Sequence, residues 1–463
     1  MRRALTRHQK RLTRSNTDAD FPARHPSQPT MAVTDRLRNR LFRNSGVATG
    51  LTSLGLRVAG LGAAFALGVV LARTLGPAEF GIYGLVVAIG ALGMTIATLG
   101  TPQLAVREFG ARLGSERQAD IPGLAKSYLS ATLLSSVGIA ILAVTAAFFI
   151  DPTALGIVLP GAVAIPFLAV TALIAAQLRG LGAMGRGQVM DIVVRPVMAL
   201  GVIGIIAIAG WALDARTALW VQAAVAAITA LVSVRWLTQR LPPVTGKQAV
   251  SPWLRIALPL CMVDLLRQFD GTYGSMLLGW ASSDVELGLY RAAVSCSVVA
   301  SMPVTILHII YAPQVSKLVH DGKQVALQKL LARIAAIATA LVSAVTLGCL
   351  LLGRPLINLV FGPAYDGSWA PLTILCIAQL AFAWFGMGPI LLAMGRRERQ
   401  LTRIYLFAIA IAVVASSIMV ARFGAIGAAV GQLVSLALIG GLSWLDGRRR
   451  LGVDSSVLGA LRH

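Results

Sequence analysis

LARTLGPAEFGIY occupies residues 71–83, and LGWASSDVELGLY at residues 278–290 aligns with it without a gap. Four positions are identical in the two copies: Leu71, Glu79, Gly81 and Tyr83 in the first, and Leu278, Glu286, Gly288 and Tyr290 in the second. The tetrapeptide AMGR also occurs twice, at residues 183–186 and 393–396, with nearly the same offset. Two independent echoes at one spacing indicate that the chain consists of two related halves.

The composition is that of a membrane protein. Apolar residues make up 56% of the chain and charged residues 13%, against roughly 45–50% and 25% in soluble domains. A helix needs about 20 apolar residues to cross a bilayer, and runs of that length are too long for the strands of a membrane barrel. The sequence therefore predicts an all-α membrane protein with twelve spans, near residues 50–72, 80–102, 125–150, 155–178, 190–211, 216–237, 256–280, 286–311, 329–353, 369–394, 402–421 and 424–445.

The formal net charge is +22, and the basic residues are distributed along the chain as the predicted topology requires. If the N-terminus is cytoplasmic, most lysine and arginine residues fall in the basic N-terminal segment and at the inner ends of successive span pairs. The predicted outer loops hold Arg73, Arg216, Arg354 and Arg422. This asymmetry obeys the positive-inside rule and predicts that both termini are cytoplasmic. The basic charge therefore does not indicate binding to nucleic acid.

The spans divide evenly between two lobes. Six spans bring the chain back to the side where it started, so we expect the lobes to be related by a pseudo-two-fold axis along the membrane normal. The predicted divisions are a basic, disordered N-terminal tail (1–45), an N-lobe (46–240), a cytoplasmic linker (241–252), a C-lobe (253–447) and a C-terminal tail (448–463). Met31 is an alternative start to Met1, because it opens a compact stretch.

Signatures of enzyme chemistry are missing from the sequence. No phosphate-binding loop occurs, and the four cysteines lie inside apolar runs without metal-ligand spacing. The predicted outer loops are too short to fold as a catalytic domain. We therefore expect no catalytic residues, no cofactor and no metal.

Five segments, taken in order, resemble the polysaccharide transporter branch of the multidrug/oligosaccharidyl-lipid/polysaccharide exporter superfamily, the O-antigen-type flippases. They are LARTLGPAEFGIY (71–83), QLRGLGAMGRGQVMDIVVRP (177–196), ELGLYRAA (286–293), YAPQVSKL (311–318) and FGPAYDGSWAPLTIL (361–375). The resemblance runs from about residue 45 to residue 445. It implies a two-lobed bundle in the bacterial inner membrane that flips an undecaprenyl-pyrophosphate-linked oligosaccharide from cytoplasm to periplasm by alternating access.

That resemblance also places the protein in the synthesis of a polysaccharide such as O-antigen, lipopolysaccharide or exopolysaccharide. A polysaccharide polymerase and other assembly proteins are the partners it implies, beside the lipid-linked substrate and the bilayer. The motifs do not fix which positions bind pyrophosphate, so the site has to be predicted from charges within the spans.

Three arginines lie within predicted spans: Arg57, Arg267 and Arg291. Ionisable residues are costly inside a membrane and usually mark a transport pathway. A guanidinium group offers fixed, forked donors to phosphate oxygens and keeps its charge. The three arginines are therefore the predicted pyrophosphate site, although Arg291 also lies near enough to the outer interface to reach it.

Two carboxylates accompany this predicted site. Asp264 and Asp270 lie three residues to either side of Arg267, on neighbouring helical faces. One interpretation is that they are counter-charges paired with Arg267. The alternative is that they carry a coupling proton or help to hold a sodium ion.

Several other residues have predicted structural roles. Glu79 and Glu286 are expected to cap helix starts, and Gly81 and Gly288 to permit close helix approach. His308 is predicted to form a local hydrogen bond. An inner-face arginine cluster is interpreted mainly as a topology signal: Arg179, Arg186, Arg195, Arg396, Arg397, Arg399 and Arg403.

Two other functions remain open from the sequence. A cation-coupled multidrug exporter on the same fold would have a cavity rich in carboxylates and aromatic residues, without arginines. A membrane glycan polymerase or ligase would need a sizeable periplasmic loop.

Overall fold

The computed structural model describes residues 31–241, 254–395 and 397–461, and it describes their side chains from Gly55 onward except at residues 116–117, 254–256, 258–260 and 460–461. The chain divides into Met1–Ala48 and Thr49–His463, and both lobes lie within the second unit. The described residues form helices and short connections, without a strand. Residues 1–30 of the predicted tail and residues 242–253 around the predicted linker lie outside the described part.

Part of the predicted N-terminal tail is helical. Helix α1 (Met31–Ala97) begins at Met31, so residues 31–45 do not form the disordered segment that was expected. The physical reason is composition, because leucine and arginine, which recur through this stretch, both have high helix propensity.

The structure confirms the twelve predicted spans. Ten helices of the described residues are long and apolar enough to cross a membrane. Helix α1 contains two of the spans, because it breaks at Gly76, where φ is 74° and Pro77 follows. Helices α8 and α9 are each too short to cross alone, but they follow each other across Gly271 and Thr272 and form one broken span.

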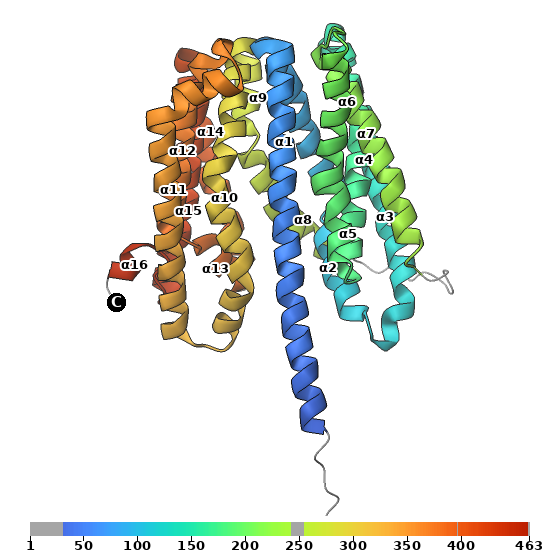
Figure 1. The fold of residues 1–463 in the computed structure, drawn as a ribbon, viewed down its shortest axis with the longest axis vertical. Helices are drawn as coiled ribbons and strands as arrows, with labels where there is room; N and C mark the ends of the chain where they lie inside the picture. The colour runs from blue at the N-terminus through green and yellow to red at the C-terminus, as the bar shows by residue number, and fades with distance from the viewer. Residues whose placement is uncertain (1–30, 242–253, 396, 462–463) are drawn as a thin grey trace, which may run out of the picture. The chain divides into compact units, whose positions relative to one another are not determined.

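The N-lobe contains the first six spans (Figure 1). Helix α1 is followed by the short helix α2, which packs on α4, and α4 in turn packs on α3 and α7. The fifth span consists of α5, a π-helical turn η3, and α6. The bounds are α2 Thr101–Arg112, α3 Ile121–Ile150, α4 Leu155–Gly180, α5 Met184–Gln188, η3 Val189–Val194, α6 Arg195–Ile208 and α7 Ala215–Thr238.

The C-lobe contains the other six spans (Figure 1). Helix α15 packs on both α12 and α14, and α11 packs on α10 and α12. The bounds are α8 Leu254–Asp270, α9 Tyr273–Ala281, α10 Asp284–His320, α11 Gln324–Val360, η4 Pro363–Ser368, α12 Trp369–Phe385, α13 Gly388–Met394, α14 Glu398–Phe423, α15 Ala425–Leu451 and α16 Leu458–Leu461.

The duplicated sequence motifs meet at the boundary between the lobes. Gly81 and Gly288 occupy equivalent positions in the two copies, and a Cβ on Gly81 would clash with the backbone of Gly288. A residue that touches its own counterpart is the mark of a two-fold contact. The pseudo-two-fold axis therefore passes between the second part of α1 and α10, and the predicted close approach at these glycines is confirmed.

The duplicated glutamates each cap the last span of their own lobe. The Glu79 carboxylate accepts a hydrogen bond from the backbone N–H of Ala215, the first residue of α7, at 2.9 Å. Glu286 accepts one from the N–H of Ala425, the first residue of α15, at 2.8 Å. A negative charge at a helix start satisfies a free N–H group and favours the helix dipole. The predicted capping role is confirmed, and each cap ties the second span of a lobe to the sixth.

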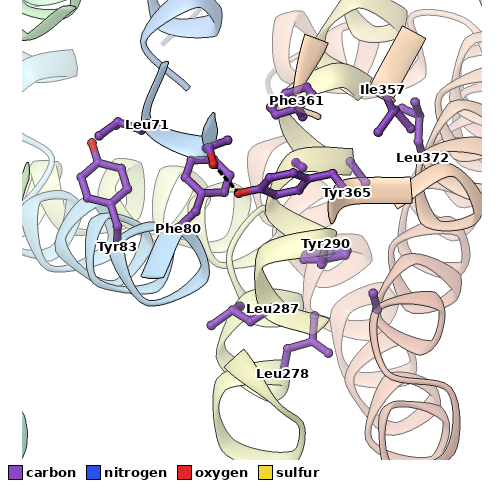
Figure 2. Close-up of a cluster of buried hydrophobic side chains, with 14 of the residues drawn as sticks. Leu71, Phe80, Tyr83, Leu278, Leu287, Tyr290, Ile357, Phe361, Tyr365 and Leu372 are labelled. Atoms are coloured by element: carbon purple, nitrogen blue, oxygen red, sulfur yellow. Dashed lines mark hydrogen bonds between the residues drawn. The ribbon is translucent and has the colours of Figure 1, made fainter. Parts of the chain in front are cut away.

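The lobes are closed against each other at the end of the bundle where α1 breaks, which we call the outer end. Tyr365 of η4 donates its hydroxyl hydrogen to the carbonyl oxygen of Ala72 at 2.9 Å (Figure 2). Arg73 donates to the carbonyl oxygen of Val360 at 2.7 Å. One buried cluster contains Leu71 and Tyr83 from the first motif and Leu278 and Tyr290 from the second (Figure 2). Apolar burial and direct hydrogen bonds thus hold the outer end together.

The described part of the predicted C-terminal tail (448–463) is packed against the C-lobe. Helix α15 continues to Leu451, and Val453, Ser455 and Ser456 are buried. Ser455 donates to the carbonyl oxygen of Phe385 at 2.9 Å, where α12 ends. The reason is local polar complementarity, because this connection offers free backbone carbonyls that a short serine-rich segment satisfies.

Asp454 fixes this segment in place. Its carboxylate accepts hydrogen bonds from the indole N–H of Trp444 at 2.7 Å and from the hydroxyl of Ser456 at 2.6 Å. Its backbone N–H and carbonyl both bond to the side chain of Gln328 on α11. Partial burial acts to raise the pKa of Asp454, but the hydrogen bonds from Ser456 and Trp444 and the charge of Arg448 outweigh it, so the pKa is lowered.

We expect Asp454→Asn to reduce stability at neutral pH by about 1–2 kcal/mol, because hydrogen bonds to a charged group are lost. A lowered folded-state pKa stabilises the protein above the ordinary aspartate pKa of 3.8, and this contribution is lost as the pH falls through the folded value. The Tm of the wild type in detergent should therefore approach that of the variant below about pH 4. A Tm difference that persisted unchanged into acid would contradict this account.

Candidate functional site

A central cavity of about 400 Å³ lies between the lobes. Its walls come from α1, α2, α4 and η3 of the N-lobe and from α8 of the C-lobe. Four charged side chains line it, namely Arg179, Asp191, Asp264 and Arg267. A cavity with polar side chains from both lobes is where a two-lobed transporter fold places its ligand.

Arg267 lies on α8, and its side chain is exposed to this cavity. The predicted ion pairs with Asp264 and Asp270 are not found, since no carboxylate of the described residues lies within 4.0 Å of Arg267. Asp264, one helical turn away, instead accepts a hydrogen bond from the side-chain amide of Gln103 on α2. The guanidinium group of Arg267 is therefore available to a ligand.

Asp270 does not line the cavity. It is 7% exposed and lies inside the C-lobe, where it accepts hydrogen bonds from Ser435 and, at 3.2 Å, from Gln432, both on α15. Asp264 and Asp270 sit on opposite sides of Arg267 in the sequence, but the helical turn directs one toward the cavity and the other into the lobe. The structure thus separates two residues that the sequence grouped together.

Arg57 contributes charge near the central cavity without lining it. It is half-buried on α1, close enough to Arg179 for electrostatic repulsion between the two guanidinium groups. Among the described residues, the Nε atom of Arg179 is buried and has no hydrogen-bond partner. Three arginines, Arg57, Arg179 and Arg267, therefore lie in or beside this region, against the two carboxylates of Asp191 and Asp264, and the small excess of positive charge favours an anion.

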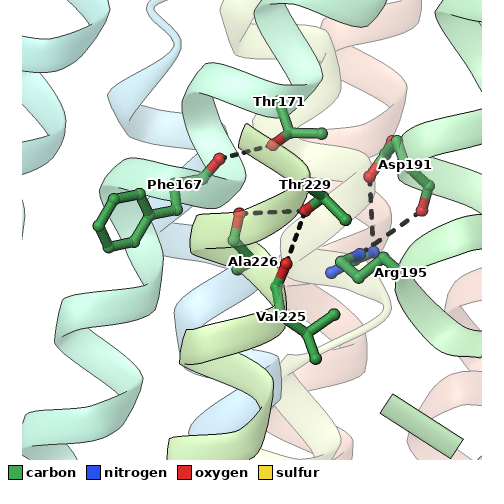
Figure 3. A network of polar contacts seen from close by, with 7 residues as sticks. All are labelled: Phe167, Thr171, Asp191, Arg195, Val225, Ala226 and Thr229. Carbon is green, nitrogen blue, oxygen red and sulfur yellow. Dashed lines mark hydrogen bonds and ion pairs between the residues drawn. The ribbon is translucent and has the colours of Figure 1, made fainter. Parts of the chain in front are cut away.

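A second cavity, of about 440 Å³, lies between α1, α4, η3, α6 and α7 of the N-lobe, and Arg291 and Ser295 of α10 line its side toward the C-lobe. We call it the N-lobe cavity. Asp191 lines both cavities, so they adjoin each other. Its side chain pairs with Arg195 across the π-helical turn at 3.5 Å (Figure 3). Gly60 of α1 packs so closely on Ile192 that a Cβ there would clash, and π-helical turns are frequent at functional sites.

Arg291 reaches the N-lobe cavity from the other lobe. It lies on α10, and its side chain passes directly over Gly84 of α1, where a Cβ would overlap it. Gly84 and Arg291 occupy equivalent positions directly after the two copies of the motif. Because the first position is glycine and the second is arginine, the C-lobe can place a charge in the N-lobe. Arg291 is therefore not in the same cavity as Arg267, although the sequence predicted a common site for them.

Three charged residues that line the two cavities were not predicted from the sequence as site residues. Arg179 and Arg195 were assigned to topology, and Asp191 was not singled out, although it is the only acidic residue in the predicted span 190–211. An aspartate inside an apolar run, followed four residues later by arginine, was a signal that could have identified it. His308 packs edge-on against Phe382 inside the C-lobe and lines neither described cavity.

Residues 49–319 match the model of a family described as polysaccharide biosynthesis protein. The match covers more than half of the chain. The chain belongs to this family. No significant match was found among curated proteins.

Solved structures of membrane transporters share the fold. An inward-facing multidrug resistance MATE transporter of the MOP superfamily has a TM-score of 0.70 at 13% identity, covering 87% of this chain and 98% of that one. The lipid II flippase MurJ, in an inward closed conformation, has a TM-score of 0.65 at 11% identity and covers 87% of both chains. A MOP superfamily transporter from Pyrococcus furiosus, with a binding pocket described as reversed in polarity, has a TM-score of 0.62 at 14% identity, covering 87% and 95%.

These likenesses establish an all-α, multi-pass membrane protein with the two-lobed MOP fold. The two six-helix lobes and their pseudo-two-fold relation, predicted from the repeated motif, are confirmed.

Proposed function

We propose that this protein is a flippase that moves undecaprenyl-pyrophosphate-linked oligosaccharide from the cytoplasmic to the periplasmic leaflet. It works without catalysis, in the bacterial inner membrane, with both termini in the cytoplasm. Its product feeds the assembly of O-antigen or another polysaccharide by a polymerase and its partner proteins. Membership of a polysaccharide biosynthesis family and the transporter fold support the coarser part of this proposal.

The observation that carries the proposal is the exposed guanidinium group of Arg267, which has no ion-pair partner among the described residues and lines a cavity between the lobes. Pyrophosphate cannot cross hydrocarbon unaided, because it would lose its hydration without compensation. Arg267 and Arg179 supply that compensation from two different lobes, and polar side chains such as Gln103 and Gln268 line the same cavity. A ligand held by both lobes can be carried as they rearrange.

The closed outer end fits one stage of alternating access. Tyr365, Arg73 and the crossing glycines hold the lobes together there. An inside-negative membrane potential favours outward movement of each negative charge by roughly 2.3 kcal/mol per 100 mV. The charge of the substrate therefore drives export in the useful direction, and Asp270, within the C-lobe, is the carboxylate we propose for any additional ion coupling.

A liposome assay tests this function. Purified protein is reconstituted with a fluorescent undecaprenyl-pyrophosphate oligosaccharide, and flipping is followed by protection of the label from an external quencher. We expect flipping of this lipid and none of a matched lipid that lacks the pyrophosphate, because the guanidinium groups of the central cavity recognise phosphate oxygens. Equal flipping of both lipids, or of neither, would contradict the proposal.

A cation-coupled multidrug exporter is the second candidate. Asp191 and Asp264 line the central cavity, and carboxylates are the groups that bind cationic drugs. The same liposomes distinguish the two functions, because uptake of a cationic dye under a proton or sodium gradient, without flipping of the lipid, would favour the exporter. The described outer connections are short, which leaves a glycan polymerase or ligase without support.

A further inference from the structure

The N-lobe cavity holds hydrogen-bond donors that the proposed central site does not use. Arg195, Arg291 and Tyr83 all line it, and both guanidinium groups are close enough to the Tyr83 hydroxyl for electrostatic interaction. Tyr83 accepts a hydrogen bond from the amide of Gln222 at 2.8 Å. Its own O–H group can therefore donate to a ligand that lies between the two arginines.

Arg291 has no counter-charge at this place. No carboxylate of the described residues lies within 4.0 Å of it, and its Nε atom is buried without a hydrogen-bond partner in that part of the chain. A buried donor left unpaired carries a free-energy cost. That cost is recovered when an anion binds, which gives the cavity a preference for one.

Arg195 can join Arg291 without strain on the fold. Its ion pair with Asp191 spans one helical turn at 3.5 Å, and both side chains are about one third exposed (Figure 3). Ion pairs of this kind, with partly exposed side chains, contribute little stability. A phosphate group can therefore replace the aspartate as the partner of Arg195 at small cost.

We propose that Arg195, Arg291 and Tyr83 form a second anion site, distinct from the central cavity, that binds a phosphate or pyrophosphate group. The rest of the N-lobe cavity is walled mainly by apolar residues such as Leu71 and Phe80, so the anion is held at the polar end. The site lies close below the outer closure, since Arg291 is one helical turn from Gly288.

This site extends the proposed function and rests on it for its role. Asp191 lines both cavities, so a pyrophosphate leaving Arg179 and Arg267 meets Arg195 next. The anion then binds at the N-lobe site after the central site and before the outer end opens. The anion thus contacts the central site first and the N-lobe site second. The N-lobe site depends on Arg291, whose charge crosses from the C-lobe.

Isothermal titration calorimetry on the full-length protein in nanodiscs of neutral phosphatidylcholine tests the site. One arm titrates inorganic pyrophosphate, and a second titrates a short polyprenyl pyrophosphate, so that a free ion and a lipid headgroup are distinguished. We expect two binding events in the wild type and one in Arg291→Gln. Tyr83→Phe should weaken the second event by about threefold to tenfold, since one hydrogen bond is lost.

A pair of glycine variants tests the position of the Arg291 side chain without changing any charge. Gly84→Ala places a methyl group against the Arg291 side chain and should weaken the second event without changing any charge. Gly62→Ala is the matched control, because Gly62 lies on the same helix, has open space around it and lines neither described cavity. We expect Gly62→Ala to bind as the wild type does.

The outcomes distinguish this site from the central one. Loss of one binding event in Arg291→Gln and of the other in Arg267→Gln supports two separate anion sites. A single event that survives Arg291→Gln and Gly84→Ala but disappears in Arg267→Gln would overturn the second site and leave the proposed function intact. If the event lost in Arg291→Gln is the only one and Arg267→Gln has no effect, the N-lobe site stands and the central site fails. Binding in only one of the two arms supports the site and identifies which source of phosphate it takes.

Discussion

Arg267→Gln is expected to lower flipping of the pyrophosphate-linked lipid by about tenfold or more, with the protein still folded. The change removes the one guanidinium group that is both exposed to the central cavity and free of a described ion pair. A hydrogen bond between charged groups contributes about 1.5–3 kcal/mol, and each 1.4 kcal/mol is a factor of ten. The initial rate of flipping in liposomes, normalised to reconstituted protein, is the measurement.

Two further variants sharpen that result. Arg267→Lys keeps the charge but loses the forked geometry, so we expect an intermediate rate. Arg333→Gln is the matched control, because Arg333 is an exposed arginine on α11 that lines neither described cavity. Arg57→Gln should reduce flipping less than Arg267→Gln, since Arg57 lies beside the cavity. Undiminished flipping in both Arg57→Gln and Arg267→Gln would remove the proposed central site.

Gly288→Ala is expected to prevent full closure of the outer end. A Cβ at this position would overlap the carbonyl oxygen of Pro77, which is backbone and cannot rotate away. Overpacking of this kind costs about 1–3 kcal/mol, which would shift the equilibrium away from the closed outer end by about fivefold or more. Flipping should fall, because one of the two alternating states is disfavoured.

Spin labels report this shift directly. Arg216 is the second residue of α7 and Arg422 the second-last residue of α14, so both lie at the outer end on different lobes, and both are exposed. Pulsed electron–electron distance measurements between labels at these positions, after replacement of the four native cysteines, should show a longer distance in Gly288→Ala. Gly348→Ala is the control, because nothing lies near a Cβ added there. An unchanged distance distribution in Gly288→Ala would show that the glycine crossing does not control closure.

Features encoded along one helix or one charge pattern could be predicted from the sequence. Apolar runs gave the twelve spans, because each must satisfy its backbone within a length set by the bilayer. The repeated motif gave two lobes and identified Glu79, Glu286, Gly81 and Gly288 as shared architecture. Arg267 and Asp264, which the sequence marks as charges within a span, both line the central cavity, and their role in binding stays a prediction.

Features that depend on which helical faces meet were not predictable. Asp264 and Asp270 look alike in the sequence, but six residues along a helix turn their side chains to different surroundings, and only one lines the central cavity. The packing of the predicted C-terminal tail could not be foreseen, because nothing in its sequence shows that Phe385 and Gln328 offer it partners. Arg179 and Arg195 lie near span ends, where topology alone accounts for arginine.

The sequence by itself determined a two-lobed, twelve-span membrane protein with cationic residues inside it, since periodicity, span length and repeat spacing are local and additive properties. Only the tertiary structure decided that Arg267 and Arg291 lie in different cavities. The two copies of the motif touch across a pseudo-two-fold axis, and Gly84 in one copy leaves the space through which Arg291 of the other enters the opposite lobe. That separation arises from contact between distant segments, which no pattern within either segment specifies.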